Sequence, residues 1–578
     1  MKKLMLGNEA VARGFLEAGC KVVSSYPGTP STEITEYAAK YDEIYCEWAP
    51  NEKVAAEVAF GASLGGARTA CCMKHVGLNV AADPLFTLSY TGVNGGLVIC
   101  VADDPGMHSS QNEQDSRHYA EAAKIPMLEP SDSREAKEFA KAAFSLSEKY
   151  DTPVLLRMCT RIAHSQCSVE MCEPEAVEVR EYVKNPQKYI MAPANAIRRH
   201  PVVEERTAAL VALAEDSVFN RAEYSEDKKL GIITSGTSYQ YVKEIFGDSV
   251  SVLKLGLVNP LPVKLILDFA SKVDRLVVIE ELDPFIENHC KALGLKVEGK
   301  SLFPICGEFS QGLIAKALGM GEKASTKSPD QIPVRPPVMC AGCPHRGLFY
   351  VLAKKKITVL GDIGCYTLGS AAPLGALDSV LCMGASVSGV HGFNKARGKD
   401  AEKKTVAVIG DSTFMHSGMT GLANIAYNGT NSTVIIVDNS ITGMTGHQHN
   451  PTTGYTIKGD PATKIDLEAL CRALGFNRVR VVDPYDLKAT EAVIVEEINA
   501  DEPSVIISRR PCALLKSVKA KPALKVDNDK CRSCKACMKI GCPAISMKNG
   551  KAHIDATLCV GCEVCEQLCA FDAIGGNN

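Results

Sequence analysis

The residues with the clearest chemical potential are eight cysteines within the last 48 positions of the chain. They form two runs that each begin with CxxCxxC: Cys531, Cys534, Cys537 and Cys542, then Cys559, Cys562, Cys565 and Cys569. Thiolates are soft ligands, and such dense spacing predicts bound metal or iron–sulfur clusters rather than disulfides in a cytoplasmic protein. Structural zinc is the alternative, because CxxC pairs also form zinc S4 sites, but zinc would leave the third cysteine of each triplet unexplained.

The spacing also predicts which cysteines share a cluster. In the bacterial two-cluster ferredoxin pattern, each CxxCxxC loop holds one 4Fe-4S cluster and the distant fourth cysteine of each run reaches the other cluster. We therefore expect one cluster on Cys531, Cys534, Cys537 and Cys569, and a second on Cys542, Cys559, Cys562 and Cys565. The first run departs from the usual pattern, since four residues rather than three separate Cys537 from Cys542, and Ala570 stands where proline is usual.

A second set of polar residues follows two apolar stretches between residues 405 and 438. TVAVIG ends at Gly410 and is followed by Asp411, and STVIIVD is followed by Asn439. Parallel strands of one βαβ unit end at the same sheet edge, so the two side chains can meet there. Oxygen ligands at such a crevice suit Mg2+ bound together with a diphosphate. Backbone N–H groups from Gly443, Met444 and Thr445, and from the helix after Ser412, would bind the diphosphate. The alternative is a strand-end turn capped by Asp411.

Two glycine- and cysteine-containing stretches give this pattern more weight. CAGCPHRG contains Cys340, Gly342 and Cys343, and GDIGCYTLG contains Gly364 and Cys365. CxxC alone would also suit a redox dithiol or half of a zinc site, although no second nearby pair is evident. Both stretches resemble loops that line the thiamine site in the 2-oxoacid:ferredoxin oxidoreductase family. The spacing of Gly410-Asp411 and Asn439 is similar to the thiamine diphosphate fingerprint, which implies that Ile441 offers its carbonyl oxygen to the metal.

The first region of the chain resembles the same family. YPGTPSTE is similar to the family loop whose threonine, here Thr29, contacts the oxoacid group. NEKVAAEVAFGAS resembles the helix whose glutamate, here Glu52, hydrogen-bonds the aminopyrimidine ring of thiamine. A carboxyl group in a dry pocket favours the imino tautomer that removes the thiamine C2 proton. Without the family pattern, Glu52 would simply be an acid in the first turn of a helix.

The resemblance covers nearly the whole chain and is strongest to large subunits of the family members that act on indolepyruvate. It implies oxidative decarboxylation of an aryl 2-oxoacid with coenzyme A, using thiamine diphosphate, Mg2+ and two 4Fe-4S clusters that pass electrons to ferredoxin. It also implies a separately encoded small (beta) subunit and a heterotetramer of two large and two small subunits. The alternatives are another 2-oxoacid, a non-oxidative thiamine-dependent decarboxylase, or an electron-carrier scaffold with a vestigial thiamine site.

Three further polar residues, His75, Arg117 and His118, occur in glycine-rich or polar stretches of the first region. They could contact a substrate carboxylate or carbonyl. The more common role for such a residue is a hydrogen-bonded or solvated one.

The composition limits the partners. The chain has 578 residues, 46% hydrophobic and 23% charged, with a formal charge of −3. This near-neutral balance disfavours nucleic acid and anionic membranes. Asn8 and Glu9 interrupt any secretory signal, which favours the cytoplasm. The window from Pro84 to Ala102 carries too many polar residues and glycines for a membrane span, so a loop and a buried strand are expected.

These residues must be positioned by a multidomain α/β protein, because helical patterns alternate with short apolar runs along most of the chain. We expect a pyrimidine-type thiamine-binding domain over residues 1–172 and a smaller, transketolase C-terminal-like α/β domain over 208–320, joined by a polar connector. A thiamine diphosphate/Mg-binding α/β domain should follow over 339–510, after a linker over 322–338. A ferredoxin-like α+β domain with both clusters should occupy 526–578.

Overall fold

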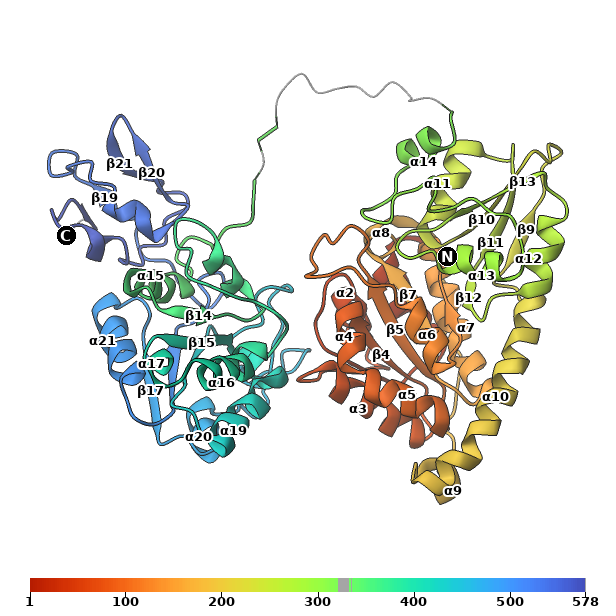
Figure 1. Cartoon of the computed structure of the whole chain (residues 1–578), viewed down its shortest axis with the longest axis horizontal. Coiled ribbons are helices and arrows are strands. Elements are labelled where there is room, and N and C mark those ends of the chain that lie inside the picture. Colours follow the sequence, from red (N-terminus) through yellow and green to blue (C-terminus); the bar gives the residue numbers. More distant parts are fainter. Residues whose placement is uncertain (321–331, 334, 577–578) are drawn as a thin grey trace. The chain divides into compact units, whose positions relative to one another are not determined.

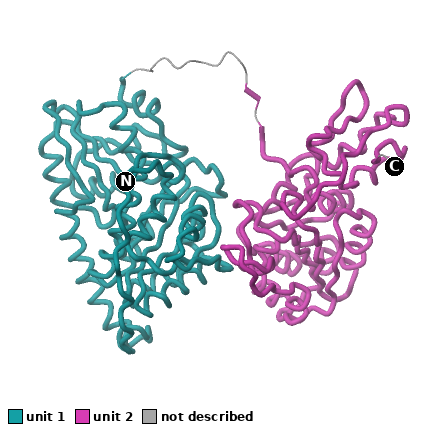
Figure 2. Tube along the Cα trace, turned by 180° about the vertical axis from the view of Figure 1, so that it is seen from behind, with its two compact units in different colours: residues 1–329 teal, residues 330–578 magenta. Residues whose placement is uncertain are grey.

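The computed structural model describes residues 1–320, 332–333 and 335–576. The chain divides into two compact units, Met1–Pro329 and Asp330–Asn578 (Figures 1 and 2). The expected domains 1–172 and 208–320 both belong to the first unit, and 339–510 and 526–578 belong to the second. Most of the linker expected over 322–338 lies outside the described residues.

A seven-stranded sheet forms the centre of the first unit, in the order β12-β6-β7-β5-β4-β2-β3. Its strands are β2 (Val22–Ser25), β3 (Tyr45–Trp48), β4 (Thr69–Lys74), β5 (Leu97–Asp103), β6 (Met127–Leu128), β7 (Val154–Cys159) and β12 (Leu257–Asn259). All neighbours are parallel except β12 and β6. β4, β5 and β7 are buried along their whole length, as the continuous apolar runs of a parallel sheet predict.

Helices cover this sheet (Figure 1). They are α1 (Gly7–Glu17), α2 (Thr32–Ala38), α3 (Glu52–Leu64), α4 (His75–Val80), α5 (Ala82–Thr91), α6 (Arg117–Ala123), α7 (Ser133–Tyr150) and α8 (Thr160–His164). Helix α3 begins where Asn51 accepts a hydrogen bond from the N–H of Val54, a typical N-cap. The short strands β1 (Lys2–Leu6) and β8 (Gln166–Glu170) form a separate antiparallel pair. The stretch from Pro84 was expected to be a loop before a buried strand, but its first part is helix α5.

A smaller sheet in the order β13-β10-β11-β9 completes the first unit. It consists of β9 (Arg221–Glu223), β10 (Leu230–Ser235), β11 (Ser251–Leu255) and β13 (Arg275–Ile279), with helices α11 (Gly236–Phe246), α12 (Val263–Ala270), α13 (Phe285–Ala292) and α14 (Gln311–Ala317). Strand β12 follows β11 directly but pairs with β6 of the large sheet, Leu257 opposite Leu128. The segment that forms the smaller sheet therefore also supplies the edge strand of the larger sheet.

The polar connector expected between these two regions is partly helical in the structure. It contains α9 (Pro186–Tyr189) and the 23-residue helix α10 (Pro193–Glu215), which packs against α5 and α12. Helix α10 buries only a narrow stripe, Val203, Arg206, Leu210 and Ala214, and contains Pro201. Such a polar, proline-containing sequence carries a weak helical pattern, so the sequence indicated a polar connector without indicating its helices.

The second unit is built on a five-stranded, fully parallel sheet in the order β14-β15-β16-β18-β17. The strands are β14 (Thr358–Leu360), β15 (Thr405–Gly410), β16 (Thr433–Asp438), β17 (Arg478–Val482) and β18 (Ser504–Arg509). The helices are α15 (His345–Lys355), α16 (Ala385–Arg397), α17 (Lys399–Glu402), α19 (Met419–Asn428), α20 (Leu467–Ala473) and α21 (Leu487–Ile498), with a 3-10 turn η1 (Cys365–Ser370). The α/β architecture with parallel sheets is thus confirmed.

The cysteine-rich tail belongs to the second unit. Its elements are β19 (Lys525–Val526), the 3-10 turn η3 (Ala536–Ile540), β20 (Ile545–Lys548), β21 (Lys551–Ile554), the 3-10 turn η4 (Glu566–Leu568) and β22 (Ile574–Gly575). β19 pairs with β22 and β20 with β21, both antiparallel. In the part of the chain that the structure describes, no helix is both long and apolar enough to cross a bilayer.

Candidate functional site

The ends of β15 and β16 bring the predicted metal ligands of the second unit to one edge. The two strands pair in parallel with Gly410 opposite Val437, so Asp411 and Asn439 both follow immediately at that edge. A short helical segment, α18 (Asp411–Thr413), begins at Asp411 and passes through a π-helical turn, η2 (Phe414–Gly418), into α19. π turns of this kind occur often at functional sites.

Asp411 lies in an environment that disfavours its negative charge. Its side chain is buried, and the Thr452 hydroxyl donates to its Oδ2 atom at 3.2 Å, with the Ser412 N–H and the Asn450 side chain as further hydrogen-bond partners. Burial and the nearby carboxylate of Asp438 raise the pKa of Asp411 to about 7. A divalent cation at this carboxylate would remove the penalty, since its charge offsets both acids. The donor set therefore fits a hard cation.

The remaining predicted ligands follow the end of β16. Asn439 and Ile441 are both buried, and the N–H of Ile441 lies 3.4 Å from the Asn439 Oδ1 atom. A Cβ atom at Gly443 would lie 3.3 Å from the Cys365 sulfur and 3.7 Å from the Asn439 amide nitrogen. Gly443, Cys365 and Asn439 thus adjoin one another. Met444 is exposed, and the Thr445 hydroxyl donates to Gln448 at 2.6 Å.

The GDIGCYTLG loop follows β14 and is held by its own aspartate. Asp362 is fully buried and accepts hydrogen bonds from the N–H groups of Gly384 and Ser386, at 2.9 and 3.0 Å. A side chain at Gly364 or at Gly410 would collide with the ring of Tyr366, because an added Cβ would lie 2.3 or 2.7 Å from the ring. The glycines therefore allow this loop to pack directly against the end of β15.

Four cysteines outside the tail gather beside this loop. Cys340, Cys343 and Cys365 were predicted from the sequence, and Cys512, three residues beyond β18, joins them. Burial, and to a smaller extent the neighbouring thiols, raises the pKa of Cys365 to about 11 and that of Cys343 to about 12. The N–H of Cys512 donates to the Asn439 carbonyl oxygen at 2.9 Å. The sequence does show that Cys512 follows the end of an apolar strand, as Asp411 and Asn439 do. An isolated cysteine is common at such a position, so Cys512 was not predicted as a site residue.

The CAGCPHRG loop also contacts the tail. A Cβ at Gly342 would lie 2.2 Å from Val560, and the Tyr485 hydroxyl donates to the Gly342 carbonyl oxygen at 2.5 Å. Arg346 is buried and donates to the carbonyl oxygens of Cys340 and Ile540, each at 3.0 Å. Tyr485 and Arg346 were not predicted, because only the folded chain shows that the loop and the tail meet.

The tail cysteines form two groups. One cavity is lined by Cys531, Cys534, Cys537 and Cys569. Cys565 lies near Cys542, Cys559 and Cys562, and burial together with these thiols raises its pKa to about 12. Within the described residues, the only three metal-binding groups that lie mutually within 4.8 Å are Asp115, His118 and Asp283, so no three thiols are that close. A tetrahedral zinc–thiolate site, with bonds of about 2.3 Å, needs sulfurs about 3.8 Å apart.

In the first unit, the predicted catalytic residues follow neighbouring strands. β2 and β3 are parallel, with Ser25 opposite Trp48, so the loop with Thr29 and the start of α3 with Glu52 leave the same edge of the sheet. Glu52 is 5% exposed, and a Cβ at Gly77 would lie 2.6 Å from its carboxylate oxygen Oε1. Thr29 is half-buried in its loop. The backbone of α4 therefore fixes the position of the Glu52 carboxylate.

Two further basic residues, Lys74 and His75, lie at the end of β4. The Lys74 ammonium donates to the Ser109 carbonyl oxygen at 2.7 Å, and burial lowers its pKa to about 8. His75 is buried, its Nε2 atom lies 3.3 Å from the Asn112 carbonyl oxygen, and burial lowers its pKa. His75 therefore remains a candidate at the edge. Lys74 was missed, since a lysine ending a strand has no distinctive sequence signal.

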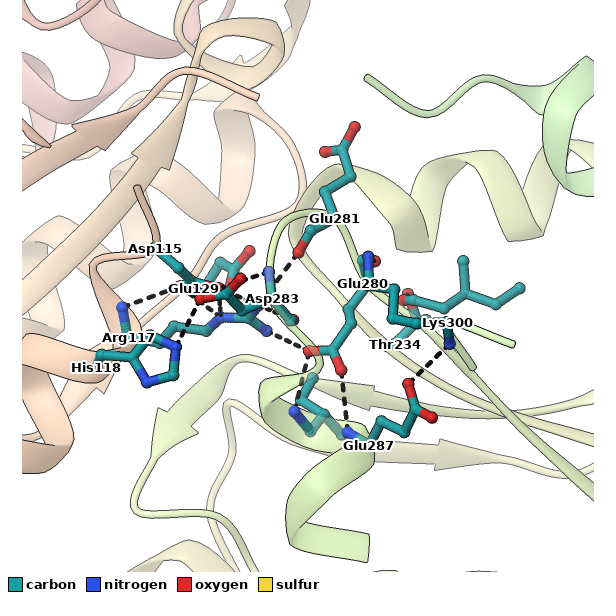
Figure 3. Close-up of polar contacts among 12 residues, drawn as sticks. Asp115, Arg117, His118, Glu129, Thr234, Glu280, Glu281, Asp283, Glu287 and Lys300 are labelled. Carbon is teal, nitrogen blue, oxygen red and sulfur yellow. Dashed lines mark hydrogen bonds and ion pairs between the residues drawn. The ribbon is translucent and has the colours of Figure 1, made fainter. Parts of the chain in front are cut away.

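Arg117 and His118 both contact carboxylates of this chain, which is the more common role expected for such residues. Arg117 is fully buried and forms ion pairs at 2.5 Å with Asp115 and Glu280, linking α6 to the end of β13 (Figure 3). It also donates to the carbonyl oxygens of Glu281 and Asp283, at 3.1 Å. His118 lies 2.9 Å from the Asp283 carboxylate on the surface. These contacts join the two sheets of the first unit, and burial of the arginine arises from packing between segments distant in sequence.

Two regions of the chain match known sequence families. Residues 13–227 match "Pyruvate flavodoxin/ferredoxin oxidoreductase, thiamine diP-bdg", and residues 362–508 match "Thiamine pyrophosphate enzyme, C-terminal TPP binding domain". The first match contains Thr29 and Glu52, and the second contains Asp411 and Asn439. Parallel α/β sheets, these matches and the site at the end of β15 define a thiamine diphosphate-binding enzyme.

Comparison with full-length relatives shows to which family of such enzymes the chain belongs. The chain is 42% identical to "Indolepyruvate oxidoreductase subunit IorA" of Archaeoglobus fulgidus, covering 99% of this chain and 97% of that protein. It is 41% identical to the same-named subunit of Pyrococcus horikoshii, covering 99% and 96%. The chain belongs to the family of indolepyruvate oxidoreductase subunits IorA, and it is a subunit of an oxidoreductase, as predicted.

A solved structure is also similar. It is the "2-oxoglutarate:ferredoxin oxidoreductase from Magnetococcus marinus with 2-oxoglutarate, coenzyme A and succinyl-CoA bound", at 18% identity and a TM-score of 0.47. The similarity covers 55% of this chain and 65% of that chain.

Proposed function

We propose that this chain is the catalytic large subunit of an enzyme that oxidatively decarboxylates indolepyruvate and related aryl 2-oxoacids. The acyl group passes to coenzyme A and the electrons to ferredoxin. The observation that carries the proposal is that the buried Asp411 and Asn439 both follow the ends of two paired parallel strands, in a chain whose full-length relatives are named indolepyruvate oxidoreductase subunits.

Asp411, Asn439 and the carbonyl oxygen of Ile441 would hold Mg2+ and, through it, a diphosphate. Backbone N–H groups at Gly443 to Thr445 and at the start of the helix after Asp411 would complete the diphosphate site. The Gly364 and Cys365 loop would line the remainder of the cofactor. When bound, thiamine diphosphate supplies an acidic carbon that attacks the keto group and accepts the electrons released with carbon dioxide.

The role proposed for Glu52 is to hold one proton against the aminopyrimidine ring. Its burial supports this role, because a carboxyl group kept from water shares a proton with a ring nitrogen rather than with solvent. The contact with Gly77 keeps the carboxylate in one position, so its reach is defined before the cofactor arrives. Thr29, on the adjacent strand end, would orient the oxoacid group.

The tail would carry electrons through two 4Fe-4S clusters, which supply one-electron redox steps. The shared cavity of Cys531, Cys534, Cys537 and Cys569 supports the crossed pairing, and so do the neighbours of Cys565. The paired order β19-η3-β20-β21-η4-β22 supports a ferredoxin-like fold. Thiols spaced more widely than zinc requires favour clusters over zinc.

The group of Cys340, Cys343, Cys365 and Cys512 has the composition of a further thiolate cluster site. It lies between the Asp411 edge and the tail within the second unit, where Tyr485 and Gly342 meet Val560. Iron analysis of protein purified without oxygen distinguishes the possibilities. Two clusters give about eight iron atoms per chain, and a third gives about twelve.

The relatives are named as subunits, and we expect a separately encoded small subunit in a heterotetramer of two large and two small chains. The test of the proposed function is anaerobic reduction of ferredoxin by the purified complex with a panel of 2-oxoacids, with and without coenzyme A. Ferredoxin reduction that requires indolepyruvate, thiamine diphosphate and Mg2+ is the expected result. Carbon dioxide release with oxidised clusters would instead identify a non-oxidative decarboxylase, and protein that binds no thiamine diphosphate would identify a scaffold.

A further inference from the structure

Charge is segregated within the cysteine-rich tail. Asp527 and Asp529 open the tail, and Asp527 lies 3.9 Å from Lys530. Residues 530–551 then contain six lysines and arginines and no acid, whereas residues 552–576 contain four acids and no lysine or arginine. The chain as a whole is almost neutral, at −3, so this concentration of positive charge is a local property of residues 530–551.

The cavity of the first cysteine group opens among these positive charges. Arg532 and Lys535 line it together with the exposed Cys534, and so do Met547 and Phe571, which is 44% exposed. We call Arg532, Cys534, Lys535 and Phe571 the outer face. Its two cations form no ion pair with any residue that the structure describes. An unneutralised basic surface around an exposed aromatic ring is a typical protein contact.

The second cysteine group faces the opposite way, toward the remainder of the second unit. Val560, between Cys559 and Cys562, meets Gly342 of the CAGCPHRG loop. The carbonyl oxygens of Ile540 and Gly541, just before Cys542, accept hydrogen bonds from Arg346. Gln567 also ties the tail to the Tyr485 carbonyl oxygen, at 2.7 Å. The tail therefore has an inner end at the cofactor-bearing sheet and an outer end at Cys534.

We propose that the outer face is the docking surface for an acidic electron-carrier protein, and that electrons leave this chain through the cluster on Cys531, Cys534, Cys537 and Cys569. This inference rests on the proposed function. In each encounter the outer cluster loses one electron and the carrier gains one, with no bond formed and no proton transferred. The two electrons released per 2-oxoacid therefore require two single-electron transfers.

Charge complementarity identifies the partner. Positive side chains without partners attract an acidic protein over about a Debye length, which is about 8 Å at physiological ionic strength, and so accelerate encounter. The effect falls as salt is added, because the attraction is screened. A small cationic acceptor gains nothing from the same surface. Ferredoxin reduction and viologen reduction should therefore respond differently to changes at the outer face.

The experiment uses the complete enzyme complex with Arg532→Glu/Lys535→Glu. Two acceptors are compared, an acidic two-cluster bacterial ferredoxin and methyl viologen, each at low and at high salt. We expect kcat/KM for ferredoxin to fall on the order of tenfold or more at low salt, and its salt dependence to flatten. Viologen reduction should stay unchanged. Lys264→Glu/Lys399→Glu, which makes the same charge change at exposed lysines elsewhere, is the matched control.

Lys548→Glu keeps the test decisive if the double variant loses iron, because Lys548 is an exposed cation of the same basic stretch and is six residues from the nearest cysteine ligand. It should lower ferredoxin reduction by a smaller factor while iron content and the EPR spectrum stay those of the wild type. Equal effects on ferredoxin and viologen, no effect on ferredoxin, or release of the small subunit would each overturn the inference. A wild-type complex that reduces neither acceptor with any 2-oxoacid would instead refute the proposed function.

Discussion

The contact between Gly77 and Glu52 allows a test of catalytic positioning that leaves the glutamate itself in place. In Gly77→Ala the new Cβ would lie 2.6 Å from Oε1 and from Cγ of Glu52, and 2.8 Å from Cδ. Ordinary contact begins at 3.4 Å, so the carboxylate must retreat by about 0.8 Å. Only the flexible Glu52 side chain has to move, because the backbone of α4 is helical at Gly77.

The expected stability change is small and the expected activity change is large. Alanine in a helix gains roughly 0.5–1 kcal/mol over glycine, and an off-rotamer glutamate costs roughly 0.5–1.5 kcal/mol, so the free energy of unfolding should change by about 1 kcal/mol or less. A displacement near 1 Å at a reacting group can lower the rate about 100-fold, which corresponds to about 2.7 kcal/mol of barrier.

The assay is 2-oxoacid-dependent viologen reduction by the anaerobic complex, alongside thermal unfolding and binding of thiamine diphosphate with Mg2+. Gly61→Ala is the matched control, because it lies on the same helix as Glu52 and an added Cβ there meets nothing within 4 Å. Glu52→Gln and the double variant complete a cycle. If the two losses multiply in the double variant, or if Gly77→Ala retains the wild-type kcat, Gly77 does not act through Glu52 and the reasoning is refuted.

Three further predictions concern the other sites. Asp411 has a pKa of about 7 without metal, so Mg2+-dependent binding of thiamine diphosphate should weaken as the pH falls through 7, by up to about tenfold per pH unit. Calorimetry with Asp411→Asn should show neither tight binding nor this pH dependence. Cys569→Ser and Cys531→Ser should remove the same EPR signal and Cys542→Ser the other one, whereas loss of the same signal in Cys542→Ser and Cys531→Ser would contradict the crossed pairing. Arg117→Met should lower the free energy of unfolding by roughly 3–5 kcal/mol, because it leaves Glu280 buried without its cation and Asp115 with only the more distant Arg157, at 3.7 Å. Unchanged denaturation would show that this ion-pair network is dispensable.

The parallel sheets and the edge that carries Asp411 and Asn439 could be predicted because both depend on local patterns. A continuous apolar run followed by a polar residue specifies a buried strand and its end, and parallel pairing then brings successive ends together. The cysteine spacing was equally informative, since it is set by the geometry of a bound group rather than by the remainder of the fold.

What the sequence did not reveal depends on packing between distant segments. Arg117 lies in a polar stretch, and only its contact with Glu280, 163 positions away, makes it a buried ion-pair residue. Cys512 became part of the thiol group because β18 ends beside β16. Helix α10 was missed because its polar surface and Pro201 conceal a helical period. β12, within the expected 208–320 domain, pairs through Leu257 and Asn259 with a strand more than 120 positions earlier, which no local pattern indicates.

The pairing of β12 with β6 limits how this chain can be divided. A fragment ending near residue 172 would leave the edge of β6 without its neighbour, and an exposed strand edge next to a buried sheet invites association with other chains. A fragment beginning near residue 208 would carry β12 with no sheet to join. Expression of either part alone should therefore yield aggregates, and truncations that keep residues 1–320 together are the ones expected to give a well-behaved protein.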